Sequence, residues 1–355
     1  MPSLTHEQRV ARRLRDRFRS LPTAFPTPGS RPRRDGASVA PHGASTGCTV
    51  LAVQARAPVD RGRDRASADS RRRPAMPTFE TPAPVRVVLS LVCGQVRIVA
   101  NDRPETTVEA YPRDSDDQDD VRTAERLHVD YADGRLTVTA PEPGCGGGAV
   151  IVVITVPTGS SLHGRGMCAD FLGAGELGEC RLSTGLGHIR LHHTGSLHLG
   201  AALGDITVDR AVGTVEATAD RGDVRLGLVE GSTTVSAKGE SDATVEEVHG
   251  AARLYAERGT VWIGRAHADV EARTSHGDID VGEVRRGSVS VATTFGSIRV
   301  GVAETSGARL SLDSAAGTVS TALSLLTAHE QADEVVCVEA RTVIGDVVVE
   351  RSGAE

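Results

Sequence analysis

Hydrophobic and polar residues alternate in short runs along most of the chain, and from about residue 178 onward each run follows a glycine. The shared pattern is a glycine, a small polar residue, and two β-branched or aliphatic residues separated by one other residue. Alternation with a period of two is typical of a strand with one buried face, so each run predicts a β-strand. The runs occupy residues 187–191, 204–208, 222–226, 259–263, 277–281, 296–300, 317–321 and 345–349, with a degenerate copy at 241–245.

Successive copies begin 17, 18, 19, 18, 18, 19, 21 and 28 residues apart, and a second strand precedes most of them, as at 270–272 and 289–291. Each repeat therefore contains two strands. Alternation predicts which side chains point inward, namely Ile279, Val281, Val289 and Val291, and which point outward, namely Asp280 and Ser290. A third inward contact is predicted at Val212, Val229, Val248 and Val284.

A repeat of about eighteen residues cannot bury its apolar face alone, whereas stacked repeats share one continuous core. The sequence therefore predicts an all-β protein, a right-handed parallel β-helix (β-solenoid) of about nine cycles. Glycine at each corner permits a positive φ without steric cost, and the polar residue after it can hydrogen-bond neighbouring backbone. The competing fold, a β-sandwich of hairpins, more often shows Asn-Gly or Asp-Gly turns at variable intervals.

Three regions follow along the chain: a disordered Arg/Pro-rich arm at 1–75, an N-terminal β-cap at 76–158 and the solenoid at 159–352. Within the cap, the pattern predicts an acidic helix in 116–126 and strands at 85–99, 107–111, 127–131, 135–140 and 150–156. The long last step between copies predicts a loop at 323–333.

Charge separates the arm from the rest. Residues 1–75 hold 16 Arg and 6 acids, a balance of +10, so the remainder of a chain with net charge −7 carries −17. A basic arm is typical of nucleic-acid or membrane contact, but the acidic folded domain predicts no nucleic-acid partner. The preferred hypothesis is that the arm is never translated and the protein begins at Met76. The arm contains no apolar core of a signal peptide, and no apolar run reaches the about 18 residues of a membrane helix, which predicts a cytoplasmic protein with surface association left open.

Several segments carry a family resemblance: the opening 76–82 (MPTFETP), the strand 94–99 (GQVRIV), the segment 177–181 (LGECR) and the recurring Gly-Asp-Ile-x-Val corners. On these segments, residues 76–352 resemble the bacterial putative-adhesin β-strand-repeat family, a domain family of unknown function. The resemblance implies a β-solenoid, supports a start at Met76 and offers no catalytic residues to carry over.

Corner acids are the first candidate site. Asp205, Asp223 and Asp242 occupy equivalent positions in three successive repeats, where stacked like charges repel each other. Bound Ca²⁺ would relieve that repulsion, but turn chemistry is the favoured interpretation because other repeats place Thr or Ser in the same position. No cofactor is predicted, with Ca²⁺ as the alternative. A histidine group at 188–198 lacks an acid or a cysteine at a recognisable metal-site spacing.

Trp262 is the second candidate, because alternation sends it outward close to Tyr255 of the same repeat, and an exposed aromatic pair is a natural contact patch. In residues 76–355, no Gly-x-Ser-x-Gly, Walker or His-Glu-x-x-His motif is present, and aromatic residues that could hold sugars are scarce. We therefore expect a non-enzymatic, adhesin-like scaffold that binds a protein or a cell-envelope polymer. The alternatives are an intracellular regulator of envelope stress and a glycan-active β-helix enzyme.

Overall fold

The computed structural model describes residues 77–140, 147–323 and 334–353, all within the compact unit Asp69–Glu355. The predicted arm at 1–75 and most of the loop predicted at 323–333 lie outside the described residues. The helix α2 spans Gln118–Glu125, and it is neither long nor apolar enough to cross a membrane.

The first seven strands are β1 (Thr78–Glu80), β2 (Arg86–Asn101), β3 (Glu105–Pro112), β4 (His128–Ala132), β5 (Arg135–Thr139), β6 (Val150–Pro157) and β7 (Ser161–Glu176). The next nine are β8 (Cys180–Leu186), β9 (Ile189–Thr194), β10 (Leu197–Leu203), β11 (Ile206–Ala211), β12 (Val215–Ala219), β13 (Val224–Val229), β14 (Thr233–Glu240), β15 (Ala243–Val248) and β16 (Ala252–Arg258). The last nine are β17 (Val261–Ala266), β18 (Val270–His276), β19 (Ile279–Val284), β20 (Gly287–Phe295), β21 (Ile298–Val302), β22 (Ser306–Ala316), β23 (Val319–Ala322), β24 (Glu334–Ile344) and β25 (Val347–Arg351).

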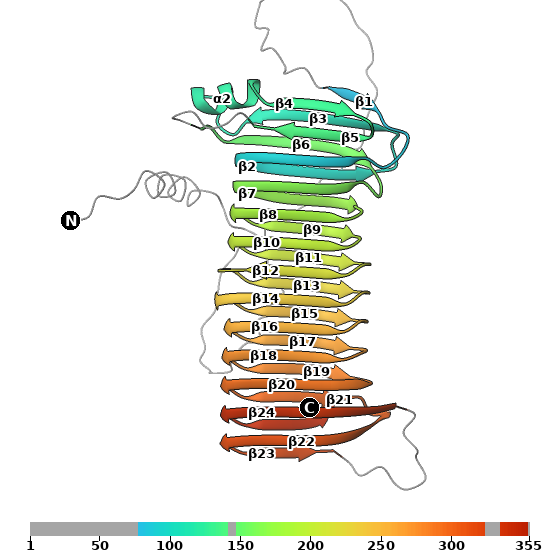
Figure 1. Ribbon diagram of the computed structural model, residues 1–355, viewed down its shortest axis with the longest axis vertical. Coiled ribbons are helices and arrows are strands. Elements are labelled where there is room, and N and C mark those ends of the chain that lie inside the picture. The colour runs from blue at the N-terminus through green and yellow to red at the C-terminus, as the bar shows by residue number, and fades with distance from the viewer. Residues whose placement is uncertain (1–76, 141–146, 324–333, 354–355) are drawn as a thin grey trace, which may run out of the picture. The chain divides into compact units, whose positions relative to one another are not determined.

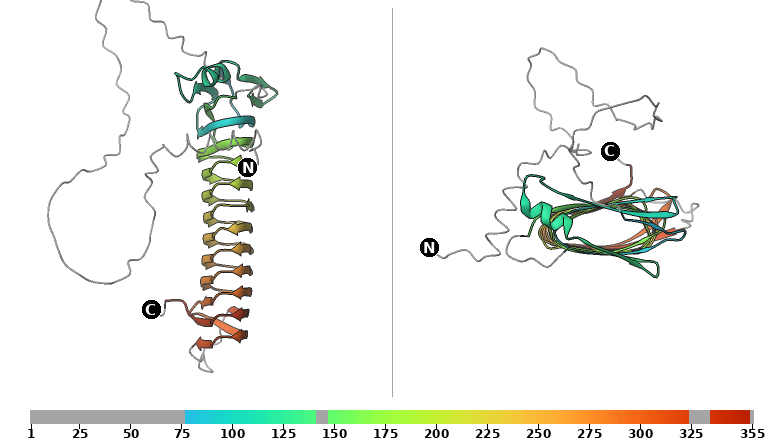
Figure 2. Two further views of the ribbon diagram at one scale, coloured as in Figure 1. Left: turned by 90° about the vertical axis from the view of Figure 1, so that its left-hand side faces the viewer. Right: turned by 90° about the horizontal axis from the view of Figure 1, so that it is seen from above.

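Strands of successive repeats stack in parallel, so the predicted solenoid is confirmed and the β-sandwich is excluded (Figure 1). Each strand from β8 to β19 pairs with the strand two positions further along the chain, which places even-numbered strands on one face and odd-numbered strands on the other. The strand pairs from β8–β9 to β24–β25 form nine two-stranded cycles in the described residues. Viewed along the stack, the two faces enclose a flattened interior (Figure 2).

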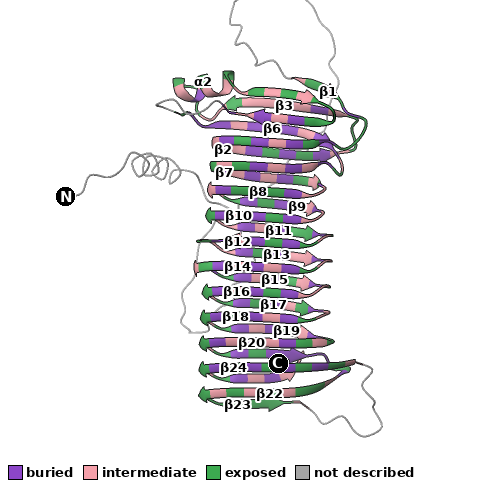
Figure 3. Ribbon diagram, viewed as in Figure 1, coloured by how far each residue is buried: buried purple, intermediate pink, exposed green. Residues whose placement is uncertain are grey.

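The interior is filled by the inward half of each alternating strand (Figure 3). The predicted inward residues Ile279, Val281 and Val289 are 0% exposed, and Val291 is 2% exposed. The prediction of a third inward residue is confirmed at Val229, Val248 and Val284. The prediction of Val212 was wrong: its side chain is 47% exposed, and Ala211 fills that position, because the third contact lies five residues after the first inward residue of the strand.

Corner glycines adopt the predicted positive φ in six of the eight glycine-led copies, with values from 134° to 149° at Gly187, Gly204, Gly222, Gly277, Gly296 and Gly345. A second requirement is close approach: a Cβ at Gly222 would lie 2.3 Å from the carbonyl oxygen of Gly204 in the preceding cycle. The degenerate copy has Ser241 at this corner, and its hydroxyl donates to Lys238 O and accepts from Gly222 N. A bulge between Ala237 and Glu240 accommodates the extra residue of that cycle.

The cycles do not follow the chain at the C-terminal end, which corrects the expectation of sequential stacking. β24 and β25 pair with β20 and β21 on one side and with β22 and β23 on the other. The cycle formed last in the sequence therefore lies between two earlier ones, and β22–β23 forms the end of the described stack (Figure 1). All repeats present the same backbone donors and acceptors, so the local pattern alone does not determine their order.

At the N-terminal end of the described stack, the order of the strands also departs from their order along the chain. β2 runs along both faces, turning at Gly94 with φ 145°, and its parallel partners are β5 and β6 on one side and β7 on the other. Beyond it, β3 pairs antiparallel with β6 and β1, and β4 pairs antiparallel with β5. Antiparallel additions cover the parallel edges that would otherwise remain open. The predicted acidic helix corresponds to α2, whose N-cap Asp117 accepts a bond from Asp119 N at 2.9 Å.

Candidate functional site

The corner acids form a ladder of side chain to backbone hydrogen bonds. Asp205 Oδ1 accepts from Asp223 N at 3.0 Å, and Asp223 Oδ1 accepts from Asp242 N at 3.0 Å. Asp242 Oδ1 then accepts from Thr260 N at 2.8 Å. Asp170, His188, Asp278 and Asp346 make the same kind of contact at other corners. Each side chain thus holds the backbone of the next cycle, as turn chemistry requires.

The predicted stacking of Asp205, Asp223 and Asp242 in successive cycles is therefore present, and the contacts of these acids satisfy backbone donors. The second carboxylate oxygen of Asp223 is 2.6 Å from the guanidinium of Arg225. The carboxylates of these acids do not bring three ligand atoms close enough together to bind one metal ion. Among the described residues, one other group of side chains does. Binding of Ca²⁺ at the corners remains the alternative to turn chemistry.

The two predicted aromatic residues lie on different faces. Tyr255 is on β16 between Ser236 and Arg273 of the neighbouring strands, whereas Trp262 is on β17 and follows Val261. Trp262 points outward as predicted, with 36% of its surface exposed, and its indole lies over Gly264 of the same strand. The structure does not bring the two rings into one patch, because consecutive strands of a cycle belong to opposite sheets.

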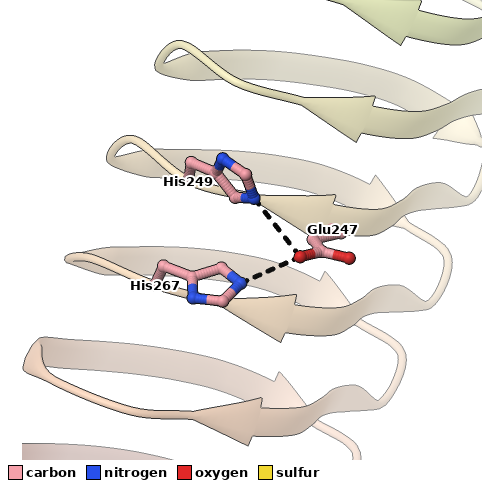
Figure 4. Close-up of side chains that lie close together, drawn as sticks. All are labelled: Glu247, His249 and His267. Atoms are coloured by element: carbon pink, nitrogen blue, oxygen red, sulfur yellow. Dashed lines mark hydrogen bonds and ion pairs between the residues drawn. The ribbon is translucent and has the colours of Figure 1, made fainter.

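The group whose ligand atoms lie close enough together to bind one metal ion consists of Glu247, His249 and His267 (Figure 4). Glu247 is in β15, His249 directly follows that strand, and His267 directly follows β17, one cycle further on. Both histidine Nε2 atoms face Glu247 Oε1, at 3.3 Å for His249 and 3.0 Å for His267. The two imidazoles meet edge to face with ring centroids 4.8 Å apart. We call these three side chains the Glu–His cluster.

Arg265 completes the surroundings of the Glu–His cluster. It lies directly beside Glu247 in the parallel register and donates to Glu247 Oε2 at 2.5 Å. This hydrogen bond, with those from His267 and His249, lowers the pKa of Glu247 to about 2. The carboxyl group is therefore ionised at neutral pH, with one oxygen toward the guanidinium and the other toward the two imidazoles.

Two further surface features lie along the corner that precedes the glycines. A hollow of about 650 Å³ is lined by Asp220, Arg221, Lys238, Gly239, Glu240, Glu257 and Arg258. Three acidic and three basic side chains line it, so its formal charges cancel. Next to it along the same corner runs a column that we call the corner ridge, formed by Arg258, His276, Phe295 and Ile344 in adjacent register.

The corner ridge is apolar toward the C-terminal cycles. The rings of His276 and Phe295 stack with centroids 4.9 Å apart and an interplanar angle of 14°. Phe295 is 44% exposed and Ile344 is 48% exposed, and Val343 beside it is also 48% exposed. Phe295 and Ile344 are direct neighbours in the register, and Val343 precedes Ile344 in the chain. Together they form an exposed apolar strip, a feature that commonly marks an interaction site.

Sequence reasoning missed both the Glu–His cluster and the corner ridge, although the signal was present. His249 and His267 are 18 residues apart and His276 and Phe295 are 19 apart, each one repeat length, so aligning the repeats by their glycines places each pair in one column. The same alignment places Phe295, Ala316 and Ile344 in one column, but it puts Ala316 between the other two. Phe295 and Ile344 are direct neighbours only because β24 lies between β20 and β22.

Fold and surface together define a parallel β-solenoid of short two-stranded cycles with a filled interior and polar corners. The chain belongs to the Toastrack DUF4097 family, whose model matches residues 87–349. This match confirms the family resemblance predicted from the sequence and assigns no catalytic residues.

Solved structures with similarity to the chain share little sequence with it. A putative adhesin from Parabacteroides merdae is 14% identical with a TM-score of 0.35, covering 78% of this chain and 95% of that one. A putative adhesin from Bacteroides fragilis is 12% identical with a TM-score of 0.29, covering 78% and 96%. A putative lipid binding protein from Parabacteroides distasonis is 12% identical with a TM-score of 0.28, covering 79% and 97%. No curated protein sequence matches the chain.

Proposed function

We propose that the protein is a non-catalytic, adhesin-like binding scaffold and that the apolar part of the corner ridge contacts a partner protein. The observation that carries this proposal is the exposure of Phe295 and its register neighbour Ile344, with Val343 next to Ile344 in the chain, beside the stacked ring of His276. Exposed apolar side chains that lie next to each other lose water favourably when a complementary surface covers them.

The location of the ridge fits a scaffold role. The interior of each cycle is filled by Val, Ile, Leu and Ala side chains, and the corner acids are bonded to backbone N–H groups. Binding groups are therefore left to the outer surface. Aliphatic Val343 and Ile344 favour a protein surface over a sugar polymer, because sugar rings are typically held by flat aromatic platforms and charged or polar partners.

The experiment compares the full chain with the double variant Phe295→Ser, Ile344→Ser and with Trp262→Ala as a matched control on the other face. Each form is immobilised and exposed to a solubilised envelope protein fraction and, separately, to purified envelope polysaccharide. We expect a specific protein to be retained by wild type and by Trp262→Ala and to be lost from the double variant. Circular dichroism checks that all three forms are equally folded.

Other outcomes discriminate the alternatives. Retention that is lost only in Trp262→Ala would transfer the contact to the tryptophan face, and retention of polysaccharide alone would replace the protein partner by an envelope polymer. Turnover of any member of a polysaccharide panel would favour the glycan-active enzyme. Cell fractionation that finds the protein only in the cytosol would end the adhesin interpretation and favour the intracellular regulator.

A further inference from the structure

We propose that Glu247, His249 and His267 bind one divalent transition-metal ion of the zinc type. The inference is independent of the partner proposed for the corner ridge, because the two features lie on different corners of the cycle. It rests on three observations: the kind of ligand atoms, their separation, and the rigidity of the backbone that carries them.

The ligand set is two imidazoles and one carboxylate. Imidazole nitrogen suits zinc, copper, iron and nickel, whereas calcium and magnesium prefer sites built from oxygen alone. Three protein ligands with the remaining coordination left to water are typical of open zinc sites. Water has access here, because the His249 side chain is 46% exposed.

The distances suit one ion. The three candidate ligand atoms all lie within 4.8 Å of one another, and the two Nε2 atoms are 3.3 Å and 3.0 Å from Glu247 Oε1. Ligand atoms bound tetrahedrally at about 2.0–2.1 Å from zinc are about 3.4 Å apart. Small side-chain rotations are therefore enough to close the site around an ion.

The backbone holds the three side chains in place. His249 N donates to Val229 O at 2.9 Å, and His267 N donates to Val248 O at 3.0 Å. Both histidines are thus fixed to the preceding cycle, and the parallel register keeps one ring next to the other. Binding therefore orders little new structure, which lowers its entropic cost.

Arg265 acts as the positioning residue. It holds Glu247 Oε2 and thereby turns Oε1 toward the imidazoles, as a hydrogen-bonded outer shell does in known metal sites. Its positive charge opposes a bound cation, but Glu283 lies directly beside Arg265 in the register and offsets that charge.

The test is isothermal titration of the untagged full chain with ZnCl₂ after removal of bound metal by a chelator. Wild type is expected to bind one equivalent. His249→Ala and His267→Ala are expected to lower the affinity by more than the about 10- to 100-fold that loss of an outer-shell partner causes. His198→Ala is the matched control, because His198 Nε2 lies 3.2 Å from Glu216 Oε2 in a pair without a second histidine, and it should bind as wild type does.

Cobalt gives a second measurement, and circular dichroism of each variant checks that a lost signal does not come from lost folding. Co²⁺ added to wild type should produce the visible absorption of a low-coordinate site, and this band should be absent in both cluster variants and present in His198→Ala. Equal zinc affinity in wild type and the cluster variants would overturn the proposal. Absence of one-equivalent binding by wild type, or an equal loss in His198→Ala, would also overturn it.

Discussion

Gly277 provides a direct test of why the corners require glycine. Its φ is 149°, and a Cβ added there would lie 2.1 Å from the carbonyl oxygen of Gly259 in the preceding cycle. Ordinary contact begins at 3.4 Å, so Gly277→Ala requires these two atoms to move about 1.3 Å further apart. The neighbouring atom is backbone and cannot rotate away, so the corner itself must open.

The cost has two sources. A non-glycine residue in this region of φ costs about 1–3 kcal/mol. Opening the corner also weakens bonds such as Gly277 N to Phe295 O at 2.8 Å and Thr274 Oγ1 to Gly259 O at 3.2 Å, each contributing about 1 kcal/mol. We therefore expect Gly277→Ala to reduce the free energy of unfolding by about 2–5 kcal/mol.

Two other glycines separate these contributions. Gly134 has φ 72° with no atom within 4 Å of an added Cβ, so Gly134→Ala should show backbone strain alone, about 1–2 kcal/mol. Gly200 has neither a positive φ nor a close atom, and Gly200→Ala should change stability little. Urea unfolding followed by circular dichroism measures the midpoint of each variant. A midpoint for Gly277→Ala equal to that of Gly200→Ala would refute the reasoning.

Three further outcomes are expected. Asp242→Asn should keep the stability of wild type because an amide oxygen can still accept from Thr260 N, whereas Asp242→Ala should lose about 1 kcal/mol in urea unfolding. Ca²⁺ added to protein from which metal has been removed should leave the melting midpoint unchanged, and a calcium-dependent midpoint would contradict turn chemistry. In a Cys48→Ser background at pH 8, a thiol reagent should label exposed Cys337 and leave Cys180 unlabelled until the protein unfolds, because burial raises the pKa of Cys180 to about 12. Mass spectrometry measures the labelling, and rapid labelling of Cys180 in the folded protein would disprove this. Because the pKa of Glu247 is lowered to about 2 from 4.5, its ionisation stabilises the fold above pH 4.5 and this contribution is lost as pH falls toward 2. The difference in urea midpoint between wild type and Glu247→Gln should therefore be greater at pH 7 than at pH 3, and a constant difference would show that the charge is not involved.

Features that depend on neighbouring residues could be read from the sequence. The two-residue alternation predicts which side chains are buried, and the glycine spacing predicts the cycle length, because both depend on local backbone geometry. The column of Asp205, Asp223 and Asp242 also follows, since equal spacing places equivalent residues one above another. A shift of one residue was enough to misassign Val212, because the third inward contact is set by the corner and not by the alternation.

The order of the cycles was decided only by the tertiary structure. Every repeat offers nearly the same hydrogen-bonding edge, so nothing local distinguishes β22 from β24 as the partner of β20, and long-range packing selects β24. That selection brings Ile344 beside Phe295 and creates the apolar strip. The separation of Tyr255 from Trp262 has a different origin, because consecutive strands of one cycle lie on opposite faces of the solenoid. The sequence alone determined the repeat and its buried face, whereas the neighbours of each outward side chain depended on how the cycles stack.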